Sequence, residues 1–290
     1  MSYTAAVDSL KKKDFLPLIK LALKEDHYKN DITTNALCDA KQKSSAKIIS
    51  YDQGVLAGIE IAQEVFRYVD SSIQCKILKE DKTLLKKSVS VLELSGPTKS
   101  ILIAERTALN FLSFMSGIAT QTRQIVQELK KYKVQLVDTR KTLPGYRMLS
   151  KYSTQAGGAV NHRLHLADMG LIKDNHIMAS AGISEAIQLF RKKNPQAKLE
   201  VEIDHIKQLE EVLPFKPDFI LLDNMSQAEL QKVSEKIVCF NQQNNCRIFI
   251  EASGGFTISS LHRLKNTKVD FVSMGSITAN IQSFNFSLEF

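Results

Sequence analysis

The fold is decided by the segment Asp138–His176, which reads DTRKTLPGYRMLSKYSTQAGGAVNHRLHLADMGLIKDNH. Two short apolar runs frame it: Val134–Val137 ends just before it, and Met169–Ile172 lies near its end. Charged or polar residues follow both runs directly, as happens when the carboxyl ends of parallel strands lead into a site. We expect the cationic side chains that follow these runs to converge on one mouth and to bind an anion with several charges: Arg140, Lys141, His162, Arg163, Lys173 and His176.

The same rhythm continues toward the end of the chain. Short β-rich runs, with helical segments between several of them, recur at Leu199–Ile203, Phe219–Leu222, Arg247–Ile250 and Val269–Ser273. This alternation is typical of a β/α barrel. A full eight-stranded barrel usually needs about 250 residues, and fewer remain here. We therefore predict an α/β fold with an incomplete TIM-like (β/α) barrel over residues 116–280.

The first hundred residues show a different pattern, in which helices mix with alternating strands. Helical periodicity covers residues 8–25 in two pieces, with Pro17 in the first turn of the second, and it returns at Gly58–Val69. A long helix follows from Lys99, and Ser116-Gly117 is expected to break or kink it. We predict an N-terminal α+β sandwich domain over residues 1–115, to which the tail 281–290 could return.

Composition limits the class of protein. The 290 residues include 43% hydrophobic residues and carry a net charge of +8. No apolar run is long enough to span a membrane, no signal peptide is apparent, and the basic residues form no block. We expect a cytoplasmic enzyme without a membrane or nucleic-acid partner, whose charge suits a small anionic substrate. The cysteines lack CxxC spacing and are expected to be reduced and structural: Cys38, Cys75, Cys239 and Cys246.

Two carboxylates follow adjacent predicted strands. Glu202 and Asp223 lie at the ends of the third and fourth barrel runs. Paired carboxylates that face a phosphate pocket suit Mg²⁺, which completes its shell with substrate oxygens and water. They could equally hold ribose hydroxyls, or form only a salt-bridge network with Lys141 and Lys173.

Two glycine turns follow the last two predicted strands. Ser253-Gly254-Gly255 precedes a helix expected near Thr257, and Gly275-Ser276 precedes another. Such loops bind phosphate on backbone N–H groups, and glycine allows the close approach. The pair predicts a phosphate site.

Arginines supply the candidate carboxylate ligands. His162 and Arg163 alone would suit an ordinary surface pair, but with Arg140 and Lys173 they make a better carboxylate clamp, because guanidinium groups bind carboxylates bidentately. Arg106, on a helix of the first domain, has the pattern of an ordinary surface arginine.

Seven short motifs occur in order along the chain. They are Glu105-Arg106-Thr107-x-Leu109-Asn110, Asp138-Thr139-Arg140-Lys141-Thr142-x-Pro144-Gly145, Asn161-His162-Arg163, Lys173-Asp174-Asn175-His176, Val201-Glu202-Ile203, Leu222-Asp223-Asn224 and Ala252-Ser253-Gly254-Gly255. Each alone is weak, but together they resemble the quinolinate phosphoribosyltransferases, decarboxylating nicotinate-nucleotide pyrophosphorylases of NAD synthesis and members of the type II phosphoribosyltransferases. The resemblance extends from about Leu21 to Thr278.

This resemblance implies a glycosyltransferase reaction in which quinolinate and phosphoribosyl pyrophosphate give nicotinate mononucleotide, pyrophosphate and CO₂, with Mg²⁺ bound largely through phosphoribosyl pyrophosphate and no organic cofactor. It also implies a homodimer in which the partner's Arg106 enters the site. By resemblance, the quinolinate carboxylates are bound by Arg140, His162, Arg163, Lys173 and the partner's Arg106. Lys141 and Lys173 then face pyrophosphate, Glu202 and Asp223 face ribose and metal, and the 5-phosphate is bound by Ser253, Gly254, Gly255, Gly275 and Ser276.

Two residues depart from the family pattern. Ala279 replaces a histidine common in relatives, so the backbone loops must bind the 5-phosphate without it. Asn30 replaces a glycine in an early turn, which we expect to survive because asparagine tolerates positive φ. The rival hypotheses are a phosphoribosyltransferase for nicotinate, nicotinamide or another acid, an isomerase or lyase that uses Lys173 as base or Schiff-base nucleophile, and a non-catalytic anion-binding protein.

Overall fold

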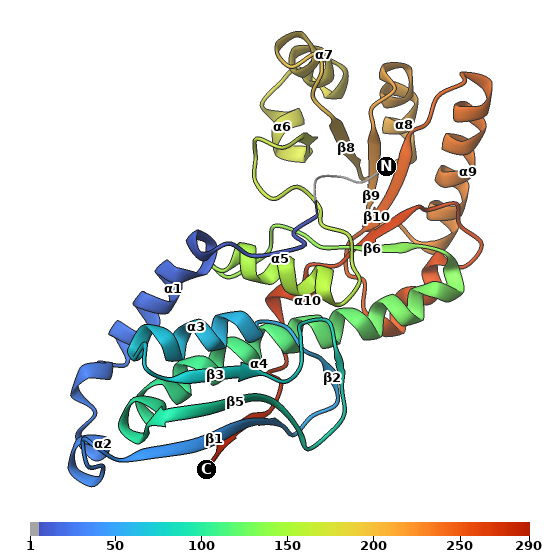
Figure 1. Ribbon diagram of the computed structural model, residues 1–290. Coiled ribbons are helices and arrows are strands. Elements are labelled where there is room, and N and C mark those ends of the chain that lie inside the picture. Colours follow the sequence, from blue (N-terminus) through green and yellow to red (C-terminus); the bar gives the residue numbers. More distant parts are fainter. Residues whose placement is uncertain (1–5) are drawn as a thin grey trace. The chain divides into compact units, whose positions relative to one another are not determined.

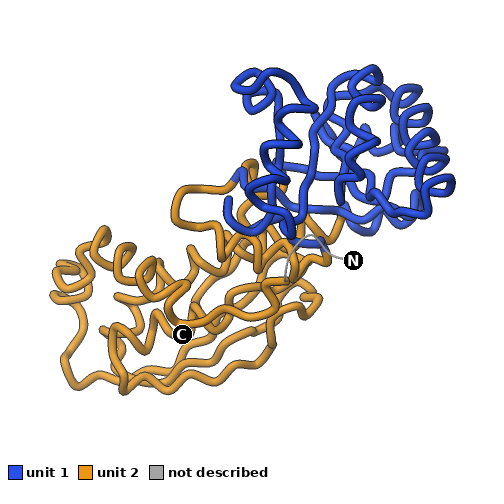
Figure 2. The backbone as a smooth tube through the Cα atoms, turned by 90° about the horizontal axis from the view of Figure 1, so that it is seen from above, with its two compact units in different colours: residues 1–5, 125–141, 159–276 blue, residues 6–124, 142–158, 277–290 orange. Residues whose placement is uncertain are grey.

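The computed structural model describes residues 6–290. The chain divides into two compact units, which are coloured separately in Figure 2. Unit 1 contains residues 125–141 and 159–276, and unit 2 contains residues 6–124, 142–158 and 277–290. The predicted domains, residues 1–115 and 116–280, stay predictions, because compactness alone does not show which segments fold independently.

Unit 1 is built on a six-stranded parallel sheet with the order β6-β11-β10-β9-β8-β7. Its strands are β6 (Gln135–Val137), β7 (Gly170–Ile172), β8 (Leu199–Ile203), β9 (Phe219–Asp223), β10 (Phe249–Ser253) and β11 (Phe271–Ser273). Each strand overlaps one of the predicted apolar runs. Since β6 and β7 are the two end strands of this order, the predicted incomplete barrel is confirmed as an open parallel sheet.

The two ends of this sheet differ in composition. Phe219, Phe249 and Phe271 begin β9, β10 and β11, and their rings lie 5.5 to 6.3 Å apart between centroids. The aromatic cluster fills the amino ends of the strands, so the carboxyl ends are left for polar side chains, as is usual in barrels.

Helices cover the outside of the sheet. Figure 1 shows α7, α8 and α9 alongside the strands that they connect. The helical elements here are η2 (Lys130–Tyr132), α6 (Asp174–Met178), α7 (Ile183–Lys193), α8 (Ile206–Val212), η3 (Leu213–Phe215), α9 (Gln227–Gln243) and η4 (Ile258–Leu264). Helix α10 (Ser276–Ala279) begins at the last residue of unit 1 and continues in unit 2. This succession of strand and helix brings each strand's carboxyl end back to the same edge.

Unit 2 is an α+β unit, as predicted. Its antiparallel sheet has the order β12-β1-β5-β3, and α3 and α4 lie on one face of it (Figure 1). The strands are β1 (Lys43–Ser50), β3 (Gln74–Ile77), β5 (Val89–Pro97) and β12 (Phe286–Glu289), with a separate pair β2 (Gly54–Val55) and β4 (Leu84–Leu85). The helices are α1 (Lys12–Glu25), η1 (Tyr28–Asn30), α2 (Ile32–Leu37), α3 (Ile59–Val69), α4 (Thr98–Leu129) and α5 (Arg147–Ala156).

Two expected helix breaks are wrong, and the kink expected as the alternative at Ser116-Gly117 stays a prediction. Pro17 lies inside a single helix α1, whose buried stripe of Phe15, Ile19 and Leu23 continues past it, so packing outweighs the lost hydrogen bond. Gly117 lies inside an uninterrupted α4, where an added Cβ would come 2.1 Å from the Gln282 carbonyl oxygen. Glycine is needed there for close approach of the backbone.

Helix α4 also bears on the expectation that no segment could span a membrane. Thr98–Tyr132 is long and apolar enough by length and composition, although 61% of its most apolar window is buried inside the protein. A buried core helix of a soluble protein meets the same criterion. This is the one stretch within residues 6–290 that does so.

The early turn survives, as expected, but for another reason. Asp31 caps α2, since its carboxylate accepts hydrogen bonds from the Thr33 and Thr34 amides at 3.0 and 2.9 Å. Asn30 has no positive φ, and the left-handed residue is His27, with φ 48°. The turn therefore does not depend on glycine at position 30.

Candidate active site

Three carboxylates meet at the carboxyl ends of β8 and β9. Glu202, Asp204 and Asp223 each offer an oxygen within 4.8 Å of the others. The two strands pair in parallel, which brings Glu202 and Asp223 to the same edge. Burial raises the pKa of both groups, and the like charge of Asp204 raises each pKa further. Such a cluster favours a bound cation or a positively charged reacting group.

Two lysines oppose these carboxylates. Lys173 Nζ lies 3.2 Å from Glu202 Oε2, and the charges of Lys173 and Lys141 both lower the pKa of Asp223. Lys141 also packs against the β11 loop, because a Cβ on Gly275 would lie 2.7 Å from its Cδ. One ion pair of the salt-bridge network considered in the sequence analysis, Lys173 with Glu202, is therefore present. The two lysines could also bind a polyanion at this edge of the sheet.

The glycine turn after β10 is tightly built. Gly254 has φ +91°, and a Cβ there would lie 2.2 Å from Asn224 Oδ1. The Asn224 amide donates to the Ser253 carbonyl at 3.1 Å. Gly255 also has positive φ, at +61°, but faces open space. Only glycine allows this backbone beside Asn224, so the loop after β10 is fixed against the end of β9.

Arg163 is a buried cation under the influence of a second arginine. Its side chain is 6% exposed, and Nη1 donates to the Met169 carbonyl at 3.1 Å. Burial lowers the pKa of Arg163, and the positive charge of Arg140 lowers it further. Arg140 is half-buried, and its Nε finds no acceptor. Two guanidinium groups whose charges act on each other, one of them with an unused donor, suit a dianion.

His162 points away from solvent. The residue is 6% exposed, and its ring Nε2 lies 2.8 Å from Glu200 Oε2 and 3.8 Å from Glu251 Oε2. Its backbone amide donates to Asp138 Oδ1 at 2.8 Å, and Asn161 donates to Asp138 Oδ2 at 2.7 Å. Asp138 thus ties the Asn161–Arg163 motif to the end of β6. The ring of His162 meets protein carboxylates, while its predicted contact with substrate stays a prediction.

Comparisons with known proteins bear on both units. The family model for the N-terminal domain of quinolinate phosphoribosyl transferase matches residues 31–116, and the model for the C-terminal domain matches residues 118–289. The chain belongs to the quinolinate phosphoribosyltransferase family. The resemblance inferred from the seven motifs is thereby confirmed.

Individual relatives agree with the family assignment. A probable nicotinate-nucleotide pyrophosphorylase [carboxylating] of Synechocystis is 37% identical over 89% of this chain and 86% of its own length. The quinolinate phosphoribosyltransferase [decarboxylating] 1b of Nicotiana tabacum is 33% identical over 95% and 82%. Among solved structures, the nicotinate-nucleotide pyrophosphorylase of Francisella tularensis is 34% identical, with a TM-score of 0.90 over 99% of both chains.

Of the predicted site residues of this phosphoribosyltransferase, Arg106 alone lies outside unit 1. Ser276 begins α10, and Ala279, which ends it, is exposed. His176 Nδ1 accepts a hydrogen bond from the Lys173 amide at 3.1 Å at the start of α6, and its expected place among the anion-binding cations stays a prediction. Arg106 is exposed on α4 in unit 2, whereas every other predicted site residue lies in unit 1.

Sequence reasoning missed residues that lie behind the site. Glu200 and Glu251 are 0% and 1% exposed on β8 and β10, and burial raises the pKa of Glu200 to about 8. The alternation Leu199-Glu200-Val201-Glu202 could have signalled Glu200, since residues two apart on a strand face one side. Arg263 was also missed: it donates to the Met225 carbonyl and to the Gly254 carbonyl, so it braces the glycine turn.

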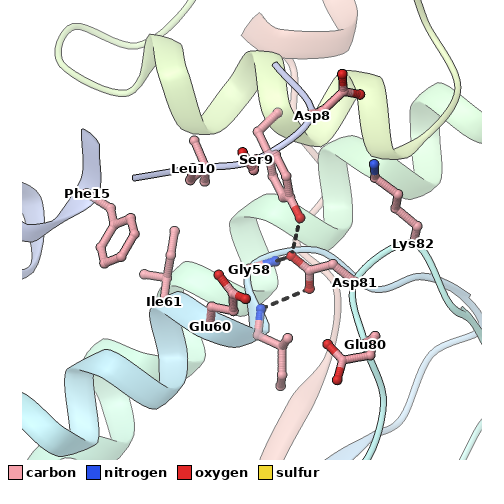
Figure 3. Close-up of a pocket in the computed structure, with 12 residues that line it drawn as sticks. Asp8, Ser9, Leu10, Phe15, Gly58, Glu60, Ile61, Glu80, Asp81 and Lys82 are labelled. Carbon is pink, nitrogen blue, oxygen red and sulfur yellow. Dashed lines mark hydrogen bonds between the residues drawn. The ribbon is translucent and has the colours of Figure 1, made fainter. Parts of the chain in front are cut away.

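A separate cavity of about 260 Å³ lies in unit 2 of this phosphoribosyltransferase (Figure 3). Asp81 lines it and accepts hydrogen bonds from the Gly58 amide, the Ile59 amide and the Tyr152 hydroxyl at 2.7 to 3.0 Å. Glu60 and Glu80 also line it. Because Asp81 caps the start of α3, it serves the fold of unit 2, and no predicted site residue lines this cavity.

Proposed function

We propose that the site on unit 1 transfers the phosphoribosyl group of phosphoribosyl pyrophosphate to quinolinate and releases CO₂, giving nicotinate mononucleotide and pyrophosphate. The observation that carries this proposal is the placement of acidic and basic groups at one edge of the sheet: Glu202, Asp204 and Asp223 oppose Lys173 and Lys141. A substrate with both a developing cation and an anionic leaving group matches that distribution.

The arginines are proposed to hold the quinolinate carboxylates. The positive charge of Arg140 acts on Arg163, and Arg163 is held by the Met169 carbonyl, so little side-chain freedom is lost when an anion binds. Lys173 and the partner's Arg106 complete the proposed set, and the ring of His162, predicted from the sequence as a further ligand, lies against Glu200 and the Arg163 amide instead. A ring held by two carboxylates has its nitrogen fixed relative to the ribose, and this orientation supplies a large share of the rate.

The chemistry at the ribose follows from charge. As the bond between C1 and the pyrophosphate oxygen breaks, positive charge develops on the ribose ring, and Glu202 and Asp223 stabilise it. Lys141 and Lys173 stabilise the charge on the departing pyrophosphate. The pyridine nitrogen forms the new bond to C1 and becomes cationic. The adjacent carboxylate then leaves as CO₂, and a proton from water replaces it on the ring carbon.

A magnesium ion is part of the proposal. Three carboxylates with oxygens within 4.8 Å of one another fit the oxygen-only preference of Mg²⁺. Glu202 and Asp223, with Asp204 beside them, would hold the ion, which would supply charge neutralisation for the pyrophosphate. The residues themselves orient the ribose. No organic cofactor enters the proposed reaction.

The 5-phosphate is proposed to bind to the backbone of Ser253, Gly254, Gly255, Gly275 and Ser276. The rigid turn beside Asn224 supports this proposal, because it presents amides without a side chain in the way. The residue Ala279 offers no polar side chain, so these loops must supply the contacts.

The assembly is proposed to be a homodimer in which Arg106 enters the partner's site. Exposure of Arg106 on α4 supports a role outside its own unit. We further propose a cytoplasmic enzyme with neither a nucleic-acid nor a membrane partner. Burial of 61% of the most apolar window of Thr98–Tyr132 inside the protein supports the proposal of no membrane partner.

A turnover assay with phosphoribosyl pyrophosphate and Mg²⁺ tests the proposal, with quinolinate and nicotinate offered in parallel. We expect mononucleotide and CO₂ from quinolinate alone. Product from nicotinate alone would keep the phosphate site but overturn the two-carboxylate assignment. Borohydride trapping with a carbonyl substrate tests the lyase alternative, and we expect no adduct on Lys173.

A further inference from the structure

Three ionisable side chains lie together behind the arginines of unit 1. His162, Glu200 and Glu251 are 6%, 0% and 1% exposed, and their ligand atoms lie within 4.8 Å of one another. They come from the loop after Val160 and from strands β8 and β10, which are separated in the sheet by β9. Two carboxylates placed in a protein interior are costly unless they serve a partner, so this cluster calls for a function.

The backbone fixes the protonation of the His162 ring. The Arg163 amide donates a hydrogen bond to His162 Nδ1 at 2.7 Å, so Nδ1 must carry a lone pair. A neutral ring then carries its proton on Nε2, and that nitrogen lies 2.8 Å from Glu200 Oε2. Glu200 therefore selects one tautomer, in which Nε2–H donates to Glu200 and Nδ1 accepts from the Arg163 amide.

We propose that Glu200 and Glu251 are positioning residues that act through His162 to hold Arg163 in the geometry that binds the substrate's carboxylates. The proposal rests on the proposed function in taking Arg163 as a substrate ligand. It assigns the imidazole of His162 a supporting role behind Arg163.

The chain of contacts runs from the core to the guanidinium. Glu200 orients the ring, the ring accepts from the Arg163 amide, and Arg163 Nη1 is held by the Met169 carbonyl. On the other side of the same residue, Asp138 accepts from the His162 amide. Buried carboxylates thus hold His162 at its backbone amide and at its ring, while Arg163 is held at its amide by that ring and at its guanidinium by the Met169 carbonyl.

Glu251 supports Glu200 in this arrangement. Its Oε2 lies 3.8 Å from His162 Nε2, and it shares a hydrogen bond with Glu200. A hydrogen bond between two carboxyl groups requires a proton between them. Glu251 therefore holds Glu200 in place while the ring proton points at Glu200 Oε2. A metal ion bound by the three side chains would need the Nε2 lone pair, which this tautomer lacks.

Nuclear magnetic resonance of the ring nitrogens tests the first step on the intact protein. With ¹⁵N-labelled histidine, we expect the His162 signal, identified by its loss in His162→Gln, to show protonated Nε2 and unprotonated Nδ1. Protonated Nδ1, or zinc retained in stoichiometric amount by the purified protein, would overturn the proposal. This readout needs no substrate, so it stands apart from any failure of the proposed reaction.

Kinetics test the second step. In Glu200→Ala we expect KM for quinolinate to rise about tenfold, as when a hydrogen-bond partner behind a ligating side chain is lost, with little change in KM for phosphoribosyl pyrophosphate. Glu200→Gln keeps an oxygen acceptor for Nε2–H and should restore most of the affinity. The exposed Glu235→Ala on α9 serves as the matched control.

The kinetic results for Glu200→Ala distinguish a positioning role from a purely structural one. Equal effects of Glu200→Ala on both substrates, or none on quinolinate, would contradict a positioning role. If Glu200→Ala does not fold, Glu251→Ala replaces it, with a smaller rise in the same KM expected. If the wild-type protein uses nicotinate in place of quinolinate, the proposed function fails, and the tautomer measurement still decides the role of Glu200.

Discussion

Lys173 and Glu202 form an ion pair across the ends of β7 and β8, with Nζ 3.2 Å from Oε2. Lys173 is 43% exposed and Glu202 is 13% exposed, so the lysine can turn toward a ligand while the carboxylate stays in place. The pair therefore links the groups proposed to face the leaving group and the ribose.

This link predicts non-additive kinetics. Lys173→Met and Glu202→Gln should each lower kcat/KM by about 100-fold, since each removes a charge that acts in the transition state. Because the two residues interact directly, the double variant should lose much less than the product of the single losses. Steady-state assays of the three variants measure this, with the exposed Lys192→Met as control. Fully multiplicative losses would show that the residues act independently.

A shared site predicts complementation between variants. Arg106→Ala and Lys173→Met should each be nearly inactive alone. If the partner's Arg106 enters the site, mixing them by unfolding and refolding should restore about a quarter of wild-type activity, because half of the random dimers carry one intact site. No recovery, in a mixture shown to exchange subunits, would place Arg106 in the site of its own chain or outside it.

The two glycines of the phosphate loop predict opposite sensitivities. Gly254→Ala puts a Cβ 2.2 Å from Asn224 Oδ1, whereas a Cβ on Gly255 meets nothing within 4 Å. Gly254→Ala should therefore raise KM for phosphoribosyl pyrophosphate strongly, while Gly255→Ala should cost only about 1 kcal/mol of backbone strain. Substrate titration and thermal unfolding of both variants decide this. A larger kinetic effect at Gly255 would argue against the turn as a rigid cradle.

Asp81 predicts a loss of stability far from the reaction. In Asp81→Ala the buried donors of Gly58, Ile59 and Tyr152 lose their acceptor, and the free energy of unfolding should fall by about 2 kcal/mol. Urea unfolding measures it, with exposed Glu80→Ala as control. An Asp81→Ala protein as stable as wild type would remove Asp81 as the cap of α3.

The same residue gives a pH dependence with a defined sign. Burial raises the pKa of Asp81 above its usual 3.8, so the folded state binds the proton more tightly than the unfolded state. Its contribution to the free energy of unfolding is largest below the ordinary pKa and declines as pH rises toward the raised pKa. In Asp81→Asn this decline should disappear from the unfolding profile. An unchanged profile would assign the dependence to other carboxyl groups.

The sequence predicted those parts of the fold that local chemistry controls. Runs such as Leu199–Ile203 and Phe219–Leu222 are strands because buried parallel strands need continuous apolar residues. The polar residues after them mark the edge where the carboxylates meet. The helix breaks expected at Pro17 and Gly117 do not occur. Burial of a long apolar stripe keeps α1 helical through Pro17, and Gly117 is required because the backbone of Gln282 lies against α4.

The support behind the site could not be predicted in the same way. That Glu200 and Glu251 approach one histidine depends on how far the sheet curves between β8 and β10, and no local pattern encodes that curvature. The direction of the His162 ring likewise depends on the Arg163 amide and on a carboxylate 38 residues away in sequence.

Pairing of β12 with β1 constrains the order of events during synthesis. Strand β1 is central in its sheet only because Phe286–Glu289 lies beside it, with Lys47 opposite Glu289 and Ser50 opposite Phe286. Until Phe286–Glu289 leaves the ribosome, β1 presents an open edge of unpaired amides and carbonyls, which invites association with other chains. The antiparallel sheet of unit 2 begins early in synthesis but is completed late, so we expect the exposed edge of β1 in the nascent chain to need chaperone protection until β12 has been made.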